Sequence, residues 1–205
     1  LMFVLNKLRK DKINLKRNFY VFTGSTVGVV PIISKGLQNT NDRIQAEFMG
    51  ILQECIITDV MSNKSFLGSI QDVDQLMPSE GDDQETNFFE NMIHIQKHRR
   101  GRAMRKLAIR LDGDKEFLSR SCRLYLVYPL VRTYIYNESY ISQPEIVNSS
   151  ISCISSLAST YNWKDYKTLL LQFIVTKNQG VQDSPPFRKQ RVKILSGILN
   201  SFHFP

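Results

Sequence analysis

The sequence predicts an all-α fold, specifically an α-solenoid of HEAT or armadillo-like helical repeats. Apolar residues recur at steps of three and four through most of the chain, which is the spacing of one helix face. Proline, glycine and short polar segments separate these stretches, as expected of helices joined by short loops. The 205 residues, of which 42% are hydrophobic, suffice for one core or for a short run of stacked helical units.

The division into repeats depends on helix spacing, because the similarity between successive segments is weak. Two helix starts, at Phe88 and Pro144, are slightly farther apart than the ~40–47 residues of a HEAT or armadillo repeat. An inserted loop would account for the difference. We therefore expect helical repeats over residues 1–78, an acidic loop or linker over 79–87, and helical repeats with a basic motif helix over 88–205.

Two helices with clear apolar faces are predicted within residues 1–78. The first lies between Thr40 and Ile57, and its apolar face holds Ile44, Phe48, Ile51, Leu52, Cys55 and Ile56. The second is shorter, ends before Pro78 and carries Phe66, Leu67, Ile70 and Val73. Residues 19–33 combine valines with glycine and proline and fit a helix or a strand, although the helical surroundings favour a helix.

Further helices follow the basic motif. The first has Leu124, Tyr125, Tyr128, Val131 and Ile135 on its apolar side, and Pro129 inside it predicts a kink or a break. The next starts at Pro144 and continues with Val147, Ile151, Ile154, Ala158 and Tyr161. Asn162 is expected to cap another, with the stripe Trp163, Tyr166, Leu169, Leu170, Phe173 and Ile174. After a loop at Gln179–Pro186, the last helix carries Val192, Leu195, Ile198, Leu199 and Phe202.

The segment Phe88–Ala108 is predicted to be one amphipathic helix with a dense basic face. A helical wheel centred on Leu107 groups the apolar residues Phe89, Met92, Ile93, Ala103, Met104 and Leu111. The opposite side carries a cationic stripe of His94, His98, Arg102 and Arg105. Arginine pairs well with phosphate through its planar guanidinium, so these residues, with Lys97 and Lys106, are candidate contacts to RNA or to an acidic partner. A solvated face, or one paired with acids of a neighbouring helix, is the alternative.

Two polar residues of this segment fall inside the apolar stripe of the wheel. They are Gln96 and Arg100, and a buried arginine needs partners, since an unpaired charge there costs several kcal/mol. We expect a structural role, in which Arg100 reaches carboxylates or carbonyl groups of an adjacent helix. Trp163 is likewise expected in the core rather than as a platform for stacked bases.

Composition narrows the classes of function. The net charge of +8 favours nucleic acid or an acidic partner over an acidic substrate. A basic run near the start, Lys7, Arg9, Lys10, Lys12, Lys16 and Arg17, is a second possible contact or a solvated segment. No apolar run approaches a membrane span and no secretory signal is visible, while the start at Leu1 suggests a piece of a longer protein.

Signatures of cofactor or metal chemistry are weak. The three cysteines, Cys55, Cys122 and Cys153, are widely spaced and are expected to be buried free thiols in a reducing compartment. His94 and His98 have the spacing of zinc ligands, but no further ligand stands nearby. Gly24–Gly28 lacks the lysine and hydroxyl of a phosphate-binding loop. We therefore expect no cofactor, no metal, no small-molecule substrate and no enzymatic activity.

The basic segment resembles one family closely. Its Asn-Met-Ile-His-Ile-Gln-Lys-His-Arg-Arg-Gly-Arg-Ala core is similar to a helix of the DRIM (down-regulated in metastasis) family, very large HEAT-repeat proteins of the small-subunit processome. The resemblance covers about residues 87–204, through Leu124–Pro129, Asn162–Tyr166 and Ser201–Phe204. The matching motif positions are His94, Gln96, His98, Arg99, Arg100, Arg102, Ala103 and Leu107. Gly101 departs from the motif and should weaken the helix locally.

The resemblance implies a non-catalytic scaffold in ribosome biogenesis. Such a protein would act in a nucleolar small nucleolar RNP, where it would organise precursor ribosomal RNA and assembly proteins during maturation of small-subunit ribosomal RNA. The alternative is a protein-interaction solenoid of another class, such as a transport adaptor, with no RNA contact. The resemblance does not assign RNA contact to the basic helix itself.

Overall fold

A computed structural model describes residues 29–62, 67–78, 86–174 and 185–205 as helices and their connections. The elements are α3 (Val29–Leu37), α4 (Asp42–Ser62), η1 (Gly68–Leu76), α5 (Phe88–Ile93), α6 (Lys97–Gly113), α7 (Arg120–Cys122), η3 (Arg123–Val127), α8 (Tyr128–Tyr136), η4 (Glu138–Tyr140), α9 (Pro144–Ser159), α10 (Trp163–Ile174) and α11 (Pro185–Asn200). No strand occurs among these residues. The prediction of an all-α solenoid is confirmed.

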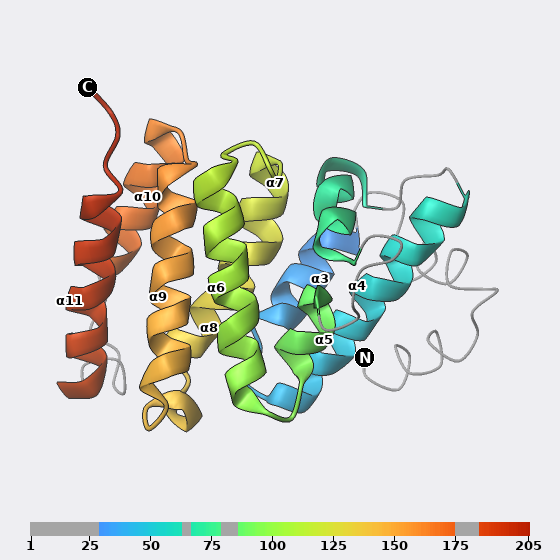
Figure 1. The fold of residues 1–205 in the computed structure, drawn as a ribbon, viewed down its shortest axis with the longest axis horizontal. Coiled ribbons are helices and arrows are strands. Elements are labelled where there is room, and N and C mark those ends of the chain that lie inside the picture. Colours follow the sequence, from blue (N-terminus) through green and yellow to red (C-terminus); the bar gives the residue numbers. More distant parts are fainter. Residues whose placement is uncertain (1–28, 63–66, 79–85, 175–184) are drawn as a thin grey trace.

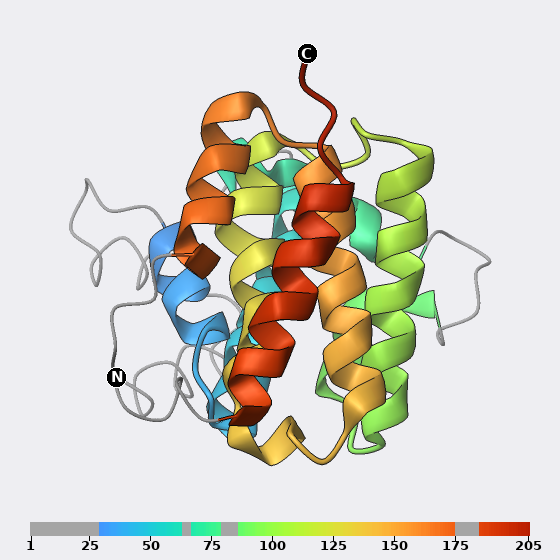
Figure 2. The same cartoon turned by 90° about the vertical axis from the view of Figure 1, so that its left-hand side faces the viewer.

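The longer helices stand side by side in a row that runs from α4 to α11 (Figure 1). Seen from the end, α6 and α9 are neighbours on one side, and α8 and α10 lie on the other (Figure 2). One continuous cluster of buried apolar side chains, from Ile33 in α3 to Ile198 in α11, fills the space between these layers. No helix in the described part of the chain is long and apolar enough to cross a membrane.

Several helix starts lie where the sequence predicts them. Pro144 occupies the first turn of α9, where its missing N–H is not needed. The Oδ1 atom of Asn162 accepts a hydrogen bond of 2.9 Å from the backbone N–H of Asp165 and so caps α10. Asn87 caps α5 in the same way, through the N–H groups of Phe89 and Glu90 at 3.0 and 3.3 Å.

The predicted core of the central helices is largely confirmed. In α4, five of the six expected residues are buried, namely Phe48, Ile51, Leu52, Cys55 and Ile56. The whole predicted stripe of α9 and its end is buried as well, from Val147 to Tyr161. All three cysteines are buried free thiols, as expected. Burial raises the pKa of the Cys153 thiol to about 12 and also raises that of Cys122.

Two glycines permit close approach between helices. A Cβ atom on Gly36 of α3 would lie 2.1 Å from Cγ of Phe48 in α4, so α3 could not pack there with any larger residue. A Cβ on Gly197 of α11 would lie 2.2 Å from the Oγ of Ser155 in α9. The Gly36 contact places α3 against α4 at a distance that only glycine allows, whereas at Gly197 the Ser155 hydroxyl could rotate away from a Cβ.

The basic segment is not one helix, contrary to the prediction. Helix α5 ends at Ile93, the backbone is extended at His94 (φ −63°, ψ 142°) and at Gln96 (φ −77°, ψ 104°), and α6 begins at Lys97. Hydrogen bonds outside a helix stabilise the break, because the His94 carbonyl accepts from Nε of Arg100 at 3.1 Å and Nδ1 of His94 accepts from the N–H of Gln96 at 3.0 Å. The one apolar side chain in the break, Ile95, is 88% exposed.

The sequence predicts a kink or a break at Pro129, and no break occurs there. The backbone stays in the right-handed helical region at Cys122, Arg123, Val127 and Tyr128. The residues before the proline form a π-helix, η3, in which the N–H of Tyr128 donates to the carbonyl of Arg123, five residues back. This wider turn relieves the clash of the proline ring with the preceding turn, and the helix continues as α8.

The surface of the C-terminal helices differs from the prediction. Trp163 and Ile174 of α10 are 52% and 55% exposed, although both were expected in the core. In α11 the buried residues are Phe187, Ile194 and Ile198, whereas the predicted Val192, Leu199 and Phe202 are more than half exposed. The reason is that α11 is the last described helix of the row and has neighbours on one side only, so a narrow stripe suffices (Figure 2).

Other predictions concern the beginning of the chain and the connections. The short helix before Pro78 is the 3₁₀ helix η1, with Leu67, Ile70 and Val73 buried. Helix α11 begins at Pro185, inside the predicted loop. The basic run Lys7–Arg17, the glycines of Gly24–Gly28, Phe66 and residues 79–85 of the acidic loop lie outside the described residues.

Candidate interaction surface on the basic helix

Helix α6 separates its residues cleanly into a buried and an exposed side. The buried side holds Arg100, Gly101, Ala103, Met104, Leu107, Ala108 and Leu111. The exposed residues are His98, Arg102, Arg105, Lys106, Ile109, Arg110, Asp112 and Gly113, so cations outnumber the one acid, Asp112. Four of the six predicted contact residues therefore lie exposed on one helix, because their spacing from His98 onward matches the turns of α6.

The other two predicted contact residues lie at the edge of this surface. His94 is half-buried in the break before α6, and its Nδ1 accepts a 3.0 Å hydrogen bond from the backbone N–H of Gln96. Lys97 is half-buried, with its Nζ 4.9 Å from the centre of the Tyr140 ring. The predicted stripe thus begins at His98 on α6, and His94 is not part of the same helix face.

Arg105 and Arg102 lie on different flanks of α6. The guanidinium of Arg105 donates from Nη1 to the Oγ of Ser149 in α9 at 2.9 Å, and that hydroxyl donates to the carbonyl of Glu145 at 2.7 Å. Arg102, Lys106 and Arg110 instead line a groove beside the end of η1. The cationic stripe therefore divides into a flank near α9 and a flank near η1.

Gln96 lies outside the helix and is exposed, contrary to the prediction that it lies in the core. Gln96 is the residue just before α6 and has an extended backbone. Its side chain makes no hydrogen bond that caps the helix. The wheel assumed an unbroken helix from Phe88, and the break at residues 94–96 removes the geometric basis of that prediction.

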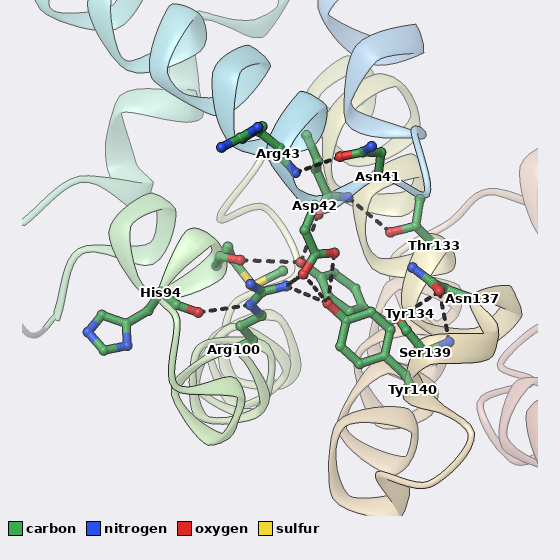
Figure 3. Close-up of polar contacts among 12 residues, drawn as sticks. Asn41, Asp42, Arg43, His94, Arg100, Thr133, Tyr134, Asn137, Ser139 and Tyr140 are labelled. Atoms are coloured by element: carbon green, nitrogen blue, oxygen red, sulfur yellow. Dashed lines mark hydrogen bonds and ion pairs between the residues drawn. The ribbon is translucent and has the colours of Figure 1, made fainter.

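Arg100 is 6% exposed and lies at the centre of a polar cluster (Figure 3). Its Nη1 donates to Oδ2 of Asp42 at 2.8 Å and to the hydroxyl of Tyr140, and its Nε donates to the carbonyl of His94 at 3.1 Å. The Tyr140 hydroxyl lies 3.0 Å from both carboxylate oxygens of Asp42 and can donate to either. One guanidinium thus joins α4, the start of α6 and η4.

A second group of hydrogen bonds continues this cluster into the core. Gln45 donates from Nε2 to the carbonyl of Leu37 at 2.9 Å and to Oγ1 of Thr133 at 3.1 Å. The hydroxyl of Tyr134 lies 3.2 Å from Oε1 of Gln45 and 3.3 Å from the carbonyl of Met92. These contacts connect α3, α4, α5 and α8, so the polar cluster joins segments far apart in the sequence.

The ionisation of this cluster suits a structural role. Burial raises the pKa values of the Tyr134 and Tyr140 phenols, and Asp42 raises that of Tyr140 further, so both phenols keep their protons even at alkaline pH, beyond the range where a free phenol does. Burial disfavours the charge on Arg100, but Tyr134, Tyr140 and Asp42 more than offset this effect and raise its pKa. A permanently charged donor is therefore held among protonated phenols and one carboxylate.

Sequence reasoning singled out Arg100 in this cluster and missed Asp42, Gln45, Tyr134 and Tyr140. One signal was available, since Gln45 stands three and seven residues before the buried Phe48 and Leu52 and so belongs to the same helix face.

Among the described residues, no three histidines, cysteines or acids gather in a way that could hold a metal ion.

Comparisons with known proteins give two relatives of this chain, while no family model matches it. A protein of Schizosaccharomyces pombe named "U3 small nucleolar RNA-associated protein 20" is 26% identical over 175 residues, which are 84% of this chain and 6% of that protein. The protein of the same name in Saccharomyces cerevisiae is 26% identical over 167 residues, 82% of this chain and 6% of that protein. The chain thus spans a small fraction of these relatives, and they confirm the resemblance carried by its basic motif: it is related by sequence to the DRIM family.

Proposed function

We propose that this chain is part of a non-catalytic scaffold for ribosome biogenesis, which organises precursor ribosomal RNA and assembly factors in the small-subunit processome of the nucleolus. The observation that carries the proposal is the exposed cationic side of α6, on a chain whose two relatives are named as U3 small nucleolar RNA-associated proteins. His98, Arg102, Arg105 and Lys106 are the proposed contacts, with His94 and Lys97 at the edge.

The surroundings of α6 suit a rigid contact surface. Arg100 anchors the start of the helix to Asp42 and Tyr140, on segments 58 and 40 residues away in the sequence. Farther along, a Cβ on Gly101 would lie 3.3 Å from the Oγ of Ser149, which is a tight contact between α6 and α9. The backbone of a helix fixed at these points need not be ordered when its cations bind phosphate, so only the side chains lose conformational freedom.

The buried polar side chains of this cluster support scaffolding rather than chemistry. Arg100, Gln45 and Tyr134 are engaged in hydrogen bonds that join separate helices and their connections. A solenoid built in this way offers an extended surface on which several partners can be held. We expect the RNA contacts to involve phosphates, so the affinity should depend on salt and little on RNA sequence.

A protein-interaction solenoid without RNA contact is the second candidate. The bond from Arg105 to Ser149 favours it, because that guanidinium already has a partner inside the chain. In that case the cations of α6 would meet acids of another protein, or water.

The test uses the full-length protein in cells. RNA crosslinked to it is sequenced, and we expect precursor ribosomal RNA, with fewer crosslinks from the double variant R102E/R105E. In binding assays with single-stranded RNA, this variant should lower the slope of log K against log salt by roughly one to two. The matched control is K164E/K167E, the same charge change on exposed residues of α10. Precursor RNA missing from the crosslinks would refute the proposal, and equal binding by both double variants would favour the interaction solenoid.

A further inference from the structure

A groove of about 470 Å³ lies between α6 and the end of η1. Its apolar walls include Leu76 and Met77 from η1 and its end, and Ala103 and Leu107 from α6. Ile109 also lines the groove and is 71% exposed. An apolar side chain left in water beside an apolar hollow is a common feature of a binding surface.

The α6 side of this groove is cationic. Arg102, Lys106 and Arg110 follow one another at four-residue steps, so they form a row along one flank of the helix. None of the described residues that line the groove is acidic. The groove therefore offers an apolar floor beside a row of positive charges, a combination that suits a ligand with carboxylates and one apolar side chain.

Arg110 is held in position at the end of this row. Its Nη1 donates to the carbonyl of Gln75 at 3.1 Å, and its guanidinium lies 3.8 Å from the centre of the Phe117 ring. A guanidinium has five N–H donors, so further donors remain for a carboxylate. A donor that is already oriented loses less entropy on binding than a free side chain would.

We propose that this groove binds an acidic peptide segment of a partner protein, with an apolar side chain of the peptide seated against the accessible Met77 and Ile109 and its carboxylates paired with Lys106 and Arg110. The site goes beyond the proposed RNA contact and does not depend on it. The lining favours a peptide over RNA, because binding of unpaired bases relies on exposed aromatic faces. Phe88 is the one aromatic residue among the described lining residues, and it is only 6% exposed.

The test is a selection of random peptides displayed on phage against the 205-residue chain. We expect enrichment of peptides that combine several acids with a leucine, isoleucine or phenylalanine. A selected peptide carrying a fluorescent label is then titrated with the variants K106E and I109A. Each should weaken binding about tenfold or more, the first through charge and the second through loss of apolar contact.

Matched controls are available on the C-terminal helices. K167E makes the same charge change on exposed α10, and V192A shortens an apolar side chain that is 65% exposed on α11. Both should bind the peptide as the native chain does. A single-stranded RNA of equal length is titrated in parallel, and its binding should be unaffected by I109A.

Three results would overturn the proposal. The first is a selection without enrichment of acidic, apolar-anchored peptides, and the second is unchanged peptide binding by K106E and I109A. The third is peptide binding seen only after Glu80, Asp82, Asp83 and Glu85 are changed to their amides, which would assign the groove to the chain's own acidic segment. Arg102 and Lys106 belong to both proposed sites, so R105E, on the flank near Ser149, is the separate readout for RNA: loss of RNA binding by R105E with unchanged peptide binding would separate the two proposals.

Discussion

Replacement of Arg100 by alanine should destabilise the fold by about 3 kcal/mol. Hydrogen bonds to charged groups contribute roughly 1.5–3 kcal/mol when they are buried, and Arg100 makes such bonds to Asp42, Tyr140 and the His94 carbonyl. The contribution of the ion pair must be discounted, because the Asp42 side chain is 42% exposed and water can solvate its carboxylate after the change. Removal of one partner of a buried ion pair costs roughly 3–5 kcal/mol in all, and the exposure of Asp42 places the expected loss at the lower end, about 3 kcal/mol.

For a chain of this size, that loss should lower the melting temperature by roughly 6–12 °C, since 1 kcal/mol shifts it by about 2–4 °C. Thermal and urea unfolding of the 205-residue chain, followed by circular dichroism, provide the measurement. Lys106→Ala on the exposed side of the same helix is the control and should change stability by less than about 0.5 kcal/mol. An Arg100→Ala variant as stable as the Lys106→Ala control would refute the argument that the cluster holds the helices together.

Three further predictions concern packing and ionisation. Gly36→Ala should lower the free energy of unfolding in urea by about 1–3 kcal/mol, because the new Cβ would overlap the buried Phe48 ring. The control is Gly50→Ala in α4, where a Cβ meets nothing within 4 Å, and it should be neutral or stabilising. Equal effects of the two substitutions would contradict the reasoning. Stability should fall at alkaline pH, because burial raises the pKa of Tyr128 from 10.0 to about 12. The protonated phenol therefore contributes fully to the free energy of unfolding below pH 10. This contribution is lost as the pH rises toward 12, by roughly 1 kcal/mol per pH unit. Urea midpoints that stay constant from pH 9 to 11.5 would argue against this. The thiols of Cys122 and Cys153 should resist a thiol reagent such as Ellman's reagent in the native chain at pH 8 and react once it is unfolded, because burial raises both pKa values; fast reaction of the native chain would contradict their placement in the core.

The helices that sequence reasoning predicted well are those with neighbours on both sides. In α9 the stripe from Val147 to Ala158 is buried as expected. Helices pack against both sides of α9, so its periodically spaced apolar residues are all covered. In α11 the same reasoning placed Ile198 and Leu195 correctly but wrongly expected Val192 and Leu199 in the core. A helix at the end of the row buries only part of its apolar surface. The spacing of apolar residues in the sequence does not predict which part is buried.

The break before α6 shows a second limit. The apolar residues Phe89 and Met92 and those from Ala103 onward fit one wheel, so nothing in the period marks an interruption between them. In the structure, the carbonyl of His94 accepts a hydrogen bond from the side chain of Arg100 instead of continuing the helix. That arrangement requires an extended backbone at His94, and it moves Gln96 out of the core.

The sequence alone determined the all-helical fold, the helix starts at Pro144 and Asn162, the family resemblance of the basic motif and the burial of Arg100. These follow from local rules, since periodicity and capping are set by residues a few positions apart. Only the tertiary structure decided the partners of Arg100, the separate flanks of α6 and the groove beside η1. Asp42 is 58 residues from Arg100, and no local pattern carries information about a contact at that separation.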